Sequence, residues 1–190
     1  MIYVFLAEGF EESEALVTVD ILRRAEYCVK TVGVGGEYVT GSHGITVKCD
    51  VLSDAVVPDS SLEAVVLPGG MPGTLNLEKN QKVNEFINYA AQNGIVIGAI
   101  CAAPSILGKL GLLKDRAATC YPGFEEFLLG ADVKEEPVCI SDNYVTANGA
   151  GAVFSFAFSL CDMVAWYQGK TQFGDFSISE KLKESMQCAL

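Results

Sequence analysis

The residue best placed for chemistry is Cys101, within the stretch Gly98-Ala-Ile-Cys101-Ala-Ala-Pro104. The pattern predicts a strand, a sharp turn and a helix start, because small residues allow close approach and proline suits a first helical turn. This resembles the logic of a nucleophile elbow, although the G-x-S-x-G sequence is absent. Unpaired N–H groups at a helix N-terminus should lower the pKa of such a thiol. The alternative interpretation is a buried structural cysteine.

A second chemical group is the carboxylate of Glu14, in a run that also contains Glu11 and Glu12. Acidic residues in a first helical turn complement the helix dipole and need no other purpose. Glu14 nevertheless belongs to a segment that should face the same crevice as Cys101. An ionised carboxylate would raise the pKa of that thiol, so the pair is sensible only if Glu14 is protonated and donates to sulfur.

A glycine-rich segment, Pro68-Gly69-Gly70-Met71-Pro72-Gly73, follows an apolar run. It is either a plain tight turn or a source of backbone N–H groups for developing negative charge, as in an oxyanion hole. It lacks the Lys-Ser/Thr signature of a Walker loop. The stretch Asn148-Gly-Ala-Gly151 is a weaker candidate for anion binding, and helix–strand packing explains it better.

Apolar strand patterns alternate with helical ones along the chain. We therefore predict an α/β fold with a mostly parallel sheet and helices on both faces, as one domain over residues 1–190. Ligands bind such sheets beyond the carboxyl ends of the strands, where segments 8–14, 68–74 and 101–104 should converge. The expected strands are 2–7, 27–34, 38–50 with a turn at 41–44, 62–67, 95–100, 117–121, 137–140 and 144–147, and the main helices are 11–26, 80–92, 102–110, 152–167 and 177–187.

Composition narrows the class of protein. The chain has 24 acidic and 13 basic residues, a formal net charge of −11 and a pI near 4.5. Such a charge disfavours nucleic acid and membrane partners. The apolar start lacks the basic flank of a signal peptide. Seven cysteines without a C-x-x-C pattern argue against a disulfide framework or zinc site. We therefore expect a cytoplasmic protein with reduced thiols.

Three motifs together resemble the ThiJ/PfpI superfamily, and within it the branch of the parkinsonism-associated deglycase, the DJ-1 family. They are Leu6-Ala-Glu-Gly-Phe-Glu-Glu-Ser-Glu14, Val66-Leu-Pro-Gly-Gly70 and Ala99-Ile-Cys-Ala-Ala-Pro104. The resemblance implies a flavodoxin-like three-layer sandwich, a homodimer, and no metal or organic cofactor. It also implies that Cys101 is an oxidisable nucleophile, that protonated Glu14 bonds it, and that the N–H groups of Gly70 and Ala102, beside Gly69, form an anion pocket.

The chain departs from this pattern at two places where relatives carry histidine. Ala102 replaces the histidine that follows the nucleophile in protease-like members, and Tyr121 replaces one that precedes a proline in others. The only histidine, His43, is predicted in a surface turn far from the crevice. These features argue against a cysteine–histidine protease or amidotransferase. Tyr121 and Asn148 are expected to line the pocket.

Two functions remain open. The first is a stress-protection enzyme that acts on small 2-oxoaldehydes or their adducts, as a cofactor-independent glyoxalase or deglycase does, with Cys101 as nucleophile and Glu14 as proton carrier. The alternative is an oxidative-stress sensor or chaperone-like protein whose Cys101 becomes a sulfinate. A simple flavodoxin-like binder is disfavoured because no phosphate loop is present, and the thiamine-biosynthesis label of some relatives has no support in these motifs.

Overall fold

Seven strands form the central sheet, in the order β10-β11-β7-β6-β1-β2-β5. A computed structural model describes residues 1–188 of the chain, so the last two residues of the domain predicted over 1–190 lie outside the described residues. All neighbouring strands are parallel except β10, which runs antiparallel to β11 at one edge. The strands are β1 (Ile2–Ala7), β2 (Val29–Val34), β5 (Val51–Leu52), β6 (Ala64–Leu67), β7 (Val96–Ile100), β10 (Val138–Ser141) and β11 (Tyr144–Ala147).

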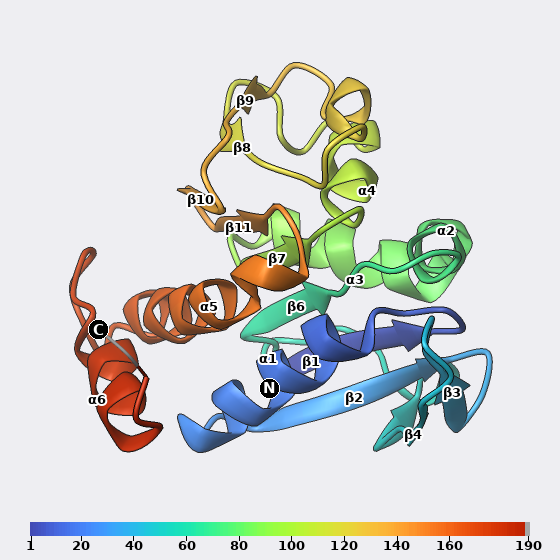
Figure 1. Cartoon of the computed structure of the whole chain (residues 1–190), viewed down its shortest axis with the longest axis horizontal. Helices are drawn as coiled ribbons and strands as arrows, with labels where there is room; N and C mark the ends of the chain where they lie inside the picture. The colour runs from blue at the N-terminus through green and yellow to red at the C-terminus, as the bar shows by residue number, and fades with distance from the viewer. Residues whose placement is uncertain (189–190) are drawn as a thin grey trace.

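Helices cover both faces of this sheet (Figure 1). Successive side chains of a strand point to opposite faces, so Val4 and Leu6 enter one apolar core while Phe5 and Ala7 enter the other. The first core also contains side chains of α1, α5 and α6, and the second contains side chains of α2, α3 and α4. The predicted three-layer α/β sandwich is confirmed. The helices are α1 (Glu12–Arg24), α2 (Gly73–Lys79), α3 (Gln81–Gln92), α4 (Pro104–Lys109), α5 (Val153–Tyr167) and α6 (Ser177–Ser185).

Two small sheets and three short 3₁₀ helices complete the described fold. The strands predicted over residues 38–50, with a turn at 41–44, are present as an antiparallel hairpin, which lies outside the central sheet. The predicted strand 117–121 pairs over two residues only. These elements are β3 (Tyr38–Thr40), β4 (Thr46–Lys48), β8 (Ala117–Ala118), β9 (Asp132–Val133), η1 (Ser53–Ala55), η2 (Glu125–Phe127) and η3 (Ala150–Ala152).

Helix α1 does not bury every apolar residue that repeats at helical spacing. Leu16 repeats in this way with Val19 and Leu22, yet it is 36% exposed, whereas Ala15 and Thr18 are fully buried. Thr18 can be buried because its hydroxyl donates to the backbone oxygen of Glu14 at 2.7 Å. The buried face of α1 therefore includes a small side chain and a hydroxyl group that is hydrogen-bonded within the helix, and a count of large apolar residues does not reveal these.

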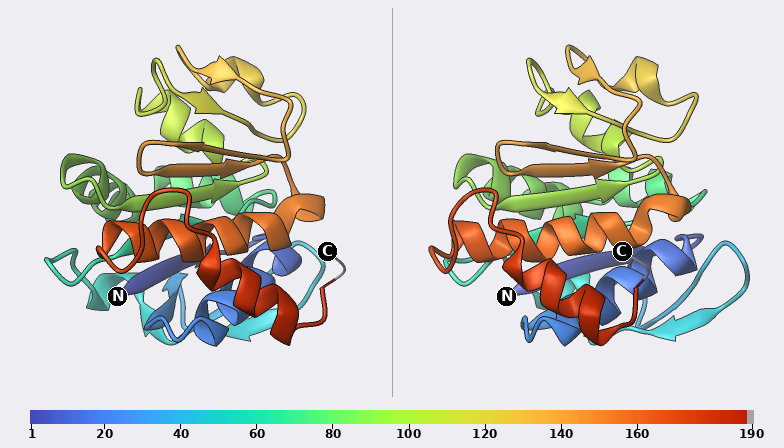
Figure 2. Two further views of the ribbon diagram at one scale, coloured as in Figure 1. Left: turned by 90° about the vertical axis from the view of Figure 1, so that its left-hand side faces the viewer. Right: turned by 60° about the vertical axis from the view of Figure 1, so that its left-hand side comes forward.

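Helix α5 is the most apolar element. An 18-residue window over Ala150–Tyr167 has a mean hydropathy of 1.4, enough by length and composition to cross a membrane, yet 61% of it is buried within the protein. It lies between the sheet, α1 and α6 (Figure 2). The buried carboxylate of Asp162 on α5 accepts the N–H of Ser179 on α6 at 3.0 Å. These are the surroundings of a core helix.

Candidate active site

The backbone of Cys101 is held by hydrogen bonds on both sides. Its N–H donates to the oxygen of Ala147 at 2.8 Å, and its oxygen accepts the N–H of Tyr121 at 2.8 Å. The residue follows β7 directly and has φ +64°, in the left-handed region that few residues other than glycine adopt. The predicted strand–turn–helix therefore exists, with α4 starting at Pro104.

Glu14 lies against the side chain of Cys101. The residue is 1% exposed, its Oε2 accepts the N–H of Gly69 at 2.8 Å, and its carboxyl group lies beside the Cys101 thiol, which favours the ionised carboxylate. Both side chains pack closely against Gly69, because a Cβ added to this residue would lie 2.8 Å from Glu14 Oε2 and 3.1 Å from Cys101 Sγ. Only glycine leaves room for this contact.

Two backbone N–H groups near the sulfur favour its ionised form. They belong to Ala102, the next residue in the turn, and to Gly70, whose φ of +88° suits a glycine. The glycine-rich segment is fixed to the start of α1, because the N–H of Glu11 donates to the oxygen of Gly69 at 2.9 Å. The three segments expected at the carboxyl ends of the strands thus meet around one sulfur atom.

Protonation of the pair departs from the expectation for the thiol alone. Burial raises the pKa of Glu14 to about 7, against the N–H of Gly69 and the thiol, which favour its ionised form. Burial and the nearby Glu14 carboxylate raise the pKa of Cys101 to about 12, although the N–H groups of Ala102 and Gly70 oppose this. The predicted lowering of the thiol pKa is therefore wrong. The two groups titrate as a coupled pair, which holds one proton above about pH 7 and two protons below it.

Tyr121 and Asn148 occupy different surroundings. Tyr121 is half exposed, and its ring is within 3.4 Å of where a Cβ on Gly149 would be. Asn148 lines a neighbouring cavity of about 420 Å³, together with Thr119, Cys120, Pro122, Glu125, Val133, Lys134 and Glu135. Tyr121 is thus connected to Cys101 by a backbone hydrogen bond, whereas Asn148 lines the neighbouring cavity.

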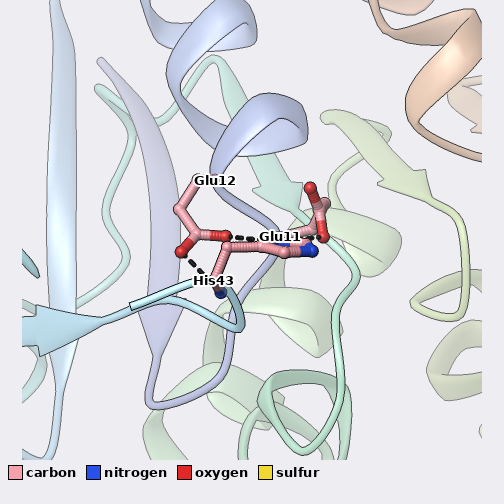
Figure 3. A group of neighbouring side chains, drawn as sticks. All are labelled: Glu11, Glu12 and His43. Atoms are coloured by element: carbon pink, nitrogen blue, oxygen red, sulfur yellow. Dashed lines mark hydrogen bonds and ion pairs between the residues drawn. The ribbon is translucent and has the colours of Figure 1, made fainter. Parts of the chain in front are cut away.

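His43 is exposed and in a turn, as predicted, but its neighbours differ from the prediction of a remote residue. Its Nδ1 lies 3.0 Å from Glu12 Oε2 and 3.4 Å from Glu11 Oε2, at the start of the helix that carries Glu14 (Figure 3). The β3–β4 hairpin folds over this segment, since the N–H of Ser42 donates to the oxygen of Phe10 at 2.8 Å. Sequence reasoning missed this contact because it joins residues 31 positions apart.

Glu12 is the buried member of this group. Its Oε1 accepts the N–H of His43 at 2.8 Å and that of Ile45 at 3.2 Å. Burial opposes ionisation, but these bonds, the His43 ring and its own N–H lower the pKa of Glu12 to about 2. Glu11, Glu12 and His43 offer oxygen and nitrogen atoms within 4.8 Å of one another, a spacing that could hold a metal ion. All three side chains already take part in hydrogen bonds.

Comparison with known proteins gives consistent results. A sequence model described as the DJ-1/PfpI family matches residues 1–163. The chain is 32% identical over 158 residues to the glutathione-independent glyoxalase DJR-1.2 of Caenorhabditis elegans, covering 82% of this chain and 83% of that protein. It is 31% identical over 153 residues to deglycase PfpI of Pyrococcus furiosus, covering 79% and 90%.

Solved structures have the same fold. Oxidized DJ-1 of Toxoplasma gondii superposes with a TM-score of 0.88 at 29% sequence identity, over 100% of this chain and 98% of that one. The similarity therefore extends over the whole sheet and its helices, and includes the segments that surround Cys101.

Proposed function

The chain belongs to the DJ-1/PfpI family, and on that premise we propose that it is a cysteine-dependent enzyme acting on small 2-oxoaldehydes or their adducts. The observation that carries the proposal is that the Glu14 carboxyl group and the Cys101 sulfur lie side by side against Gly69, with the N–H groups of Gly70 and Ala102 near the sulfur. A nucleophile, a proton carrier and donors for an oxyanion are the parts that such a reaction needs. The names of the glyoxalase and deglycase relatives support this reaction class.

The first step is attack on the aldehyde. When the shared proton is on Glu14, the Cys101 thiolate attacks the aldehyde carbon of methylglyoxal, and the electron pair of the C=O bond moves to its oxygen. That oxygen lies against the N–H groups of Gly70 and Ala102 and takes the proton from Glu14. The product is a hemithioacetal, and Glu14 is left as a carboxylate.

The second step converts the hemithioacetal to a hydroxy acid. The Glu14 carboxylate removes the proton from the former aldehyde carbon, and the released electron pair forms an enediolate with the neighbouring carbonyl. Glu14 returns the proton to that neighbouring carbon, and a proton moves from the first oxygen to the second. The resulting thioester reacts with water, which releases lactate and restores the Cys101–Glu14 pair with its one proton.

A turnover assay tests this function. Purified protein with methylglyoxal and no glutathione should form lactate, and Cys101→Ala should not. Cys28→Ala is the matched control, because Cys28 is an exposed thiol outside the site. Equal inactivity of the unmodified protein and Cys101→Ala with 2-oxoaldehydes would end the proposal.

A second candidate function is redox sensing. Cys101 is partly exposed, and the backbone N–H groups of Ala102 and Gly70 near its sulfur favour a negative charge there, which would also stabilise a sulfinate. Two molecules of peroxide would each transfer one oxygen to sulfur and leave as water. Mass spectrometry after mild peroxide should then show two added oxygens on Cys101. Modification spread evenly over the seven cysteines would count against this role.

Other expectations remain predictions. A homodimer is predicted by the resemblance, and size-exclusion chromatography with light scattering tests it. A cytoplasmic location is predicted by the apolar start without a basic flank and by the seven cysteines without a C-x-x-C pattern. A protease is not proposed, because the partner of the sulfur is a carboxyl group, and His43 is bonded to Glu12.

A further inference from the structure

The turn of the β3–β4 hairpin is attached to the first turn of α1 through one buried side chain, Glu12. Its two carboxylate oxygens accept the backbone N–H groups of His43 and Ile45 and contact the His43 ring. The side chain is 7% exposed. An added Cβ on Gly41 would collide with the Glu12 carboxyl group, so the hairpin is closed tightly around it.

Glu12 stands two residues before Glu14 on the same helical turn. A helix is stiff over one turn, so a lateral shift of the first turn moves both residues together. Glu14 tolerates little shift, because its Oε2 must stay within hydrogen-bond distance of the Gly69 N–H while the carboxyl group also contacts sulfur. The groups around Glu14 are Gly69, Cys101 and the charge of Glu11, and those around Glu12 are Ser42, His43 and Ile45.

We propose that Glu12 is a positioning residue, which uses the hairpin turn to hold the Glu14 carboxyl group against the Cys101 sulfur. Its hydrogen bonds are made to the hairpin and not to the sulfur, so it acts through Glu14. The effect on turnover rests on the proposed function, whereas the effect on the sulfur does not.

A variant at this position should still fold. The hairpin keeps its other attachments to the same segment, since the N–H of Gly9 donates to the oxygen of Thr40 at 2.8 Å and the N–H of Thr40 donates to Glu8 Oε2 at 3.0 Å. Loss of Glu12 therefore loosens the start of α1 without releasing the hairpin.

The test measures the alkylation rate of Cys101 by iodoacetamide between pH 5 and 10, with peptide mass spectrometry to separate it from the other six cysteines. In Glu12→Ala, Glu14 should become more solvated, which lowers its pKa. The step of the alkylation profile that reports the pKa of Glu14 should therefore move down by about one pH unit. Glu12→Gln should restore most of the profile, because the amide oxygen still accepts the N–H groups of His43 and Ile45.

The matched control is Asp162→Ala, which removes another buried carboxylate that accepts a backbone N–H, on a helix away from the site. It should lower the unfolding temperature without moving the alkylation profile. Gly41→Ala, which pushes the Glu12 carboxyl group from the hairpin side, should shift the profile in the same direction as Glu12→Ala. The proposal is overturned if Glu12→Ala leaves the profile unchanged, or if Asp162→Ala moves it equally.

A turnover measurement separates the proposed role of Glu12 from the proposed enzyme activity. If the unmodified protein forms lactate, Glu12→Ala should reduce kcat about tenfold or more with a smaller change in KM, because a misplaced proton carrier slows the chemical steps. If the unmodified protein is inert, the proposed function fails, and the alkylation profile alone decides the role of Glu12.

Discussion

Glu12 and Glu14 lie on the same turn of α1 and are both shielded from solvent, with 5% and 1% of their surfaces exposed. Their pKa values nevertheless move in opposite directions, to about 2 for Glu12 and about 7 for Glu14. Burial disfavours the charged form of both carboxyl groups. Glu14 lies deeper than Glu12, so burial raises its pKa more strongly, and the rest of the difference comes from their neighbours.

The neighbours differ in how many donors they supply. Glu12 receives two N–H groups from the hairpin and the ring of His43, which together outweigh burial. Glu14 receives one N–H, from Gly69, and a thiol that also carries a proton of its own. Glu12 is consequently a fixed charge, while Glu14 can gain or lose a proton near neutral pH. That ability is what a proton carrier requires.

The largest effect is expected when the sulfur beside Glu14 is removed. Cys101→Ala should reduce lactate formation about a thousandfold or more, because no nucleophile remains. It should also raise the pKa of Glu14, since the thiol donor that favours the carboxylate is lost. Carbon-13 NMR of labelled glutamate checks the pKa. An unchanged Glu14 titration would mean that the two groups do not interact.

Neutralising Glu14 should stabilise the protein at high pH. Its folded-state pKa is raised above 4.5, so the folded state binds more protons than the unfolded chain, and stability falls as pH rises from about 4.5 to about 7. Glu14→Gln avoids this cost and should increase the free energy of unfolding by up to about 3 kcal/mol at pH 8, with little gain at pH 4. Urea unfolding at the two pH values measures it. A loss of stability at pH 8 would contradict the assigned protonation.

The equivalent change at Glu12 should have the opposite sign. Its folded-state pKa is lowered, so its contribution is present above about pH 4.5 and disappears as pH falls toward 2. Glu12→Gln should reduce the free energy of unfolding by about 1–2 kcal/mol at pH 7, because hydrogen bonds to a charged acceptor become neutral ones. The same urea titrations apply. Stabilisation in both glutamine variants would mean that burial, and not the donors, controls the two residues.

The smallest effect is expected for His43→Ala. The ring is exposed, and the backbone N–H groups that hold Glu12 remain. The hydrogen bond to Glu12 raises the pKa of His43 above 6.5, so its contribution is present below that pH and is lost as pH rises through the raised value. The fall in unfolding temperature should therefore be smaller than in Glu12→Gln, and larger at pH 6 than at pH 9. Equal falls at both pH values would show that the His43–Glu12 ion pair does not contribute to stability.

The meeting of Glu14, Gly69 and Cys101 could be predicted from the sequence because each follows a buried strand, and parallel strands bring their carboxyl ends to one edge. The role of Glu12 could not, because its partners are 31 and 33 residues away in a hairpin whose position against α1 the local pattern did not define. The pKa of Cys101 was predicted in the wrong direction for a related reason. The helix start is visible in the sequence, whereas burial of the sulfur is not.

The same limit applies to the fold. The continuous apolar run of β1 identified a central strand with its bounds, since both faces of that strand are covered. The exposed position of Leu16 and the separate β3–β4 hairpin depend on how α1 rotates and where the chain folds back, which are tertiary effects. Local patterns therefore located the elements better than their contacts.

The backbone at Cys101 is shaped by its neighbours and not by its own side chain. Both of its peptide groups are engaged by Ala147 and Tyr121, in a conformation that glycine would adopt more easily. The two hydrogen bonds that hold the turn are made by the backbone and are independent of which side chain stands at position 101. This makes residue 101 a natural starting point for giving the same scaffold a different reaction.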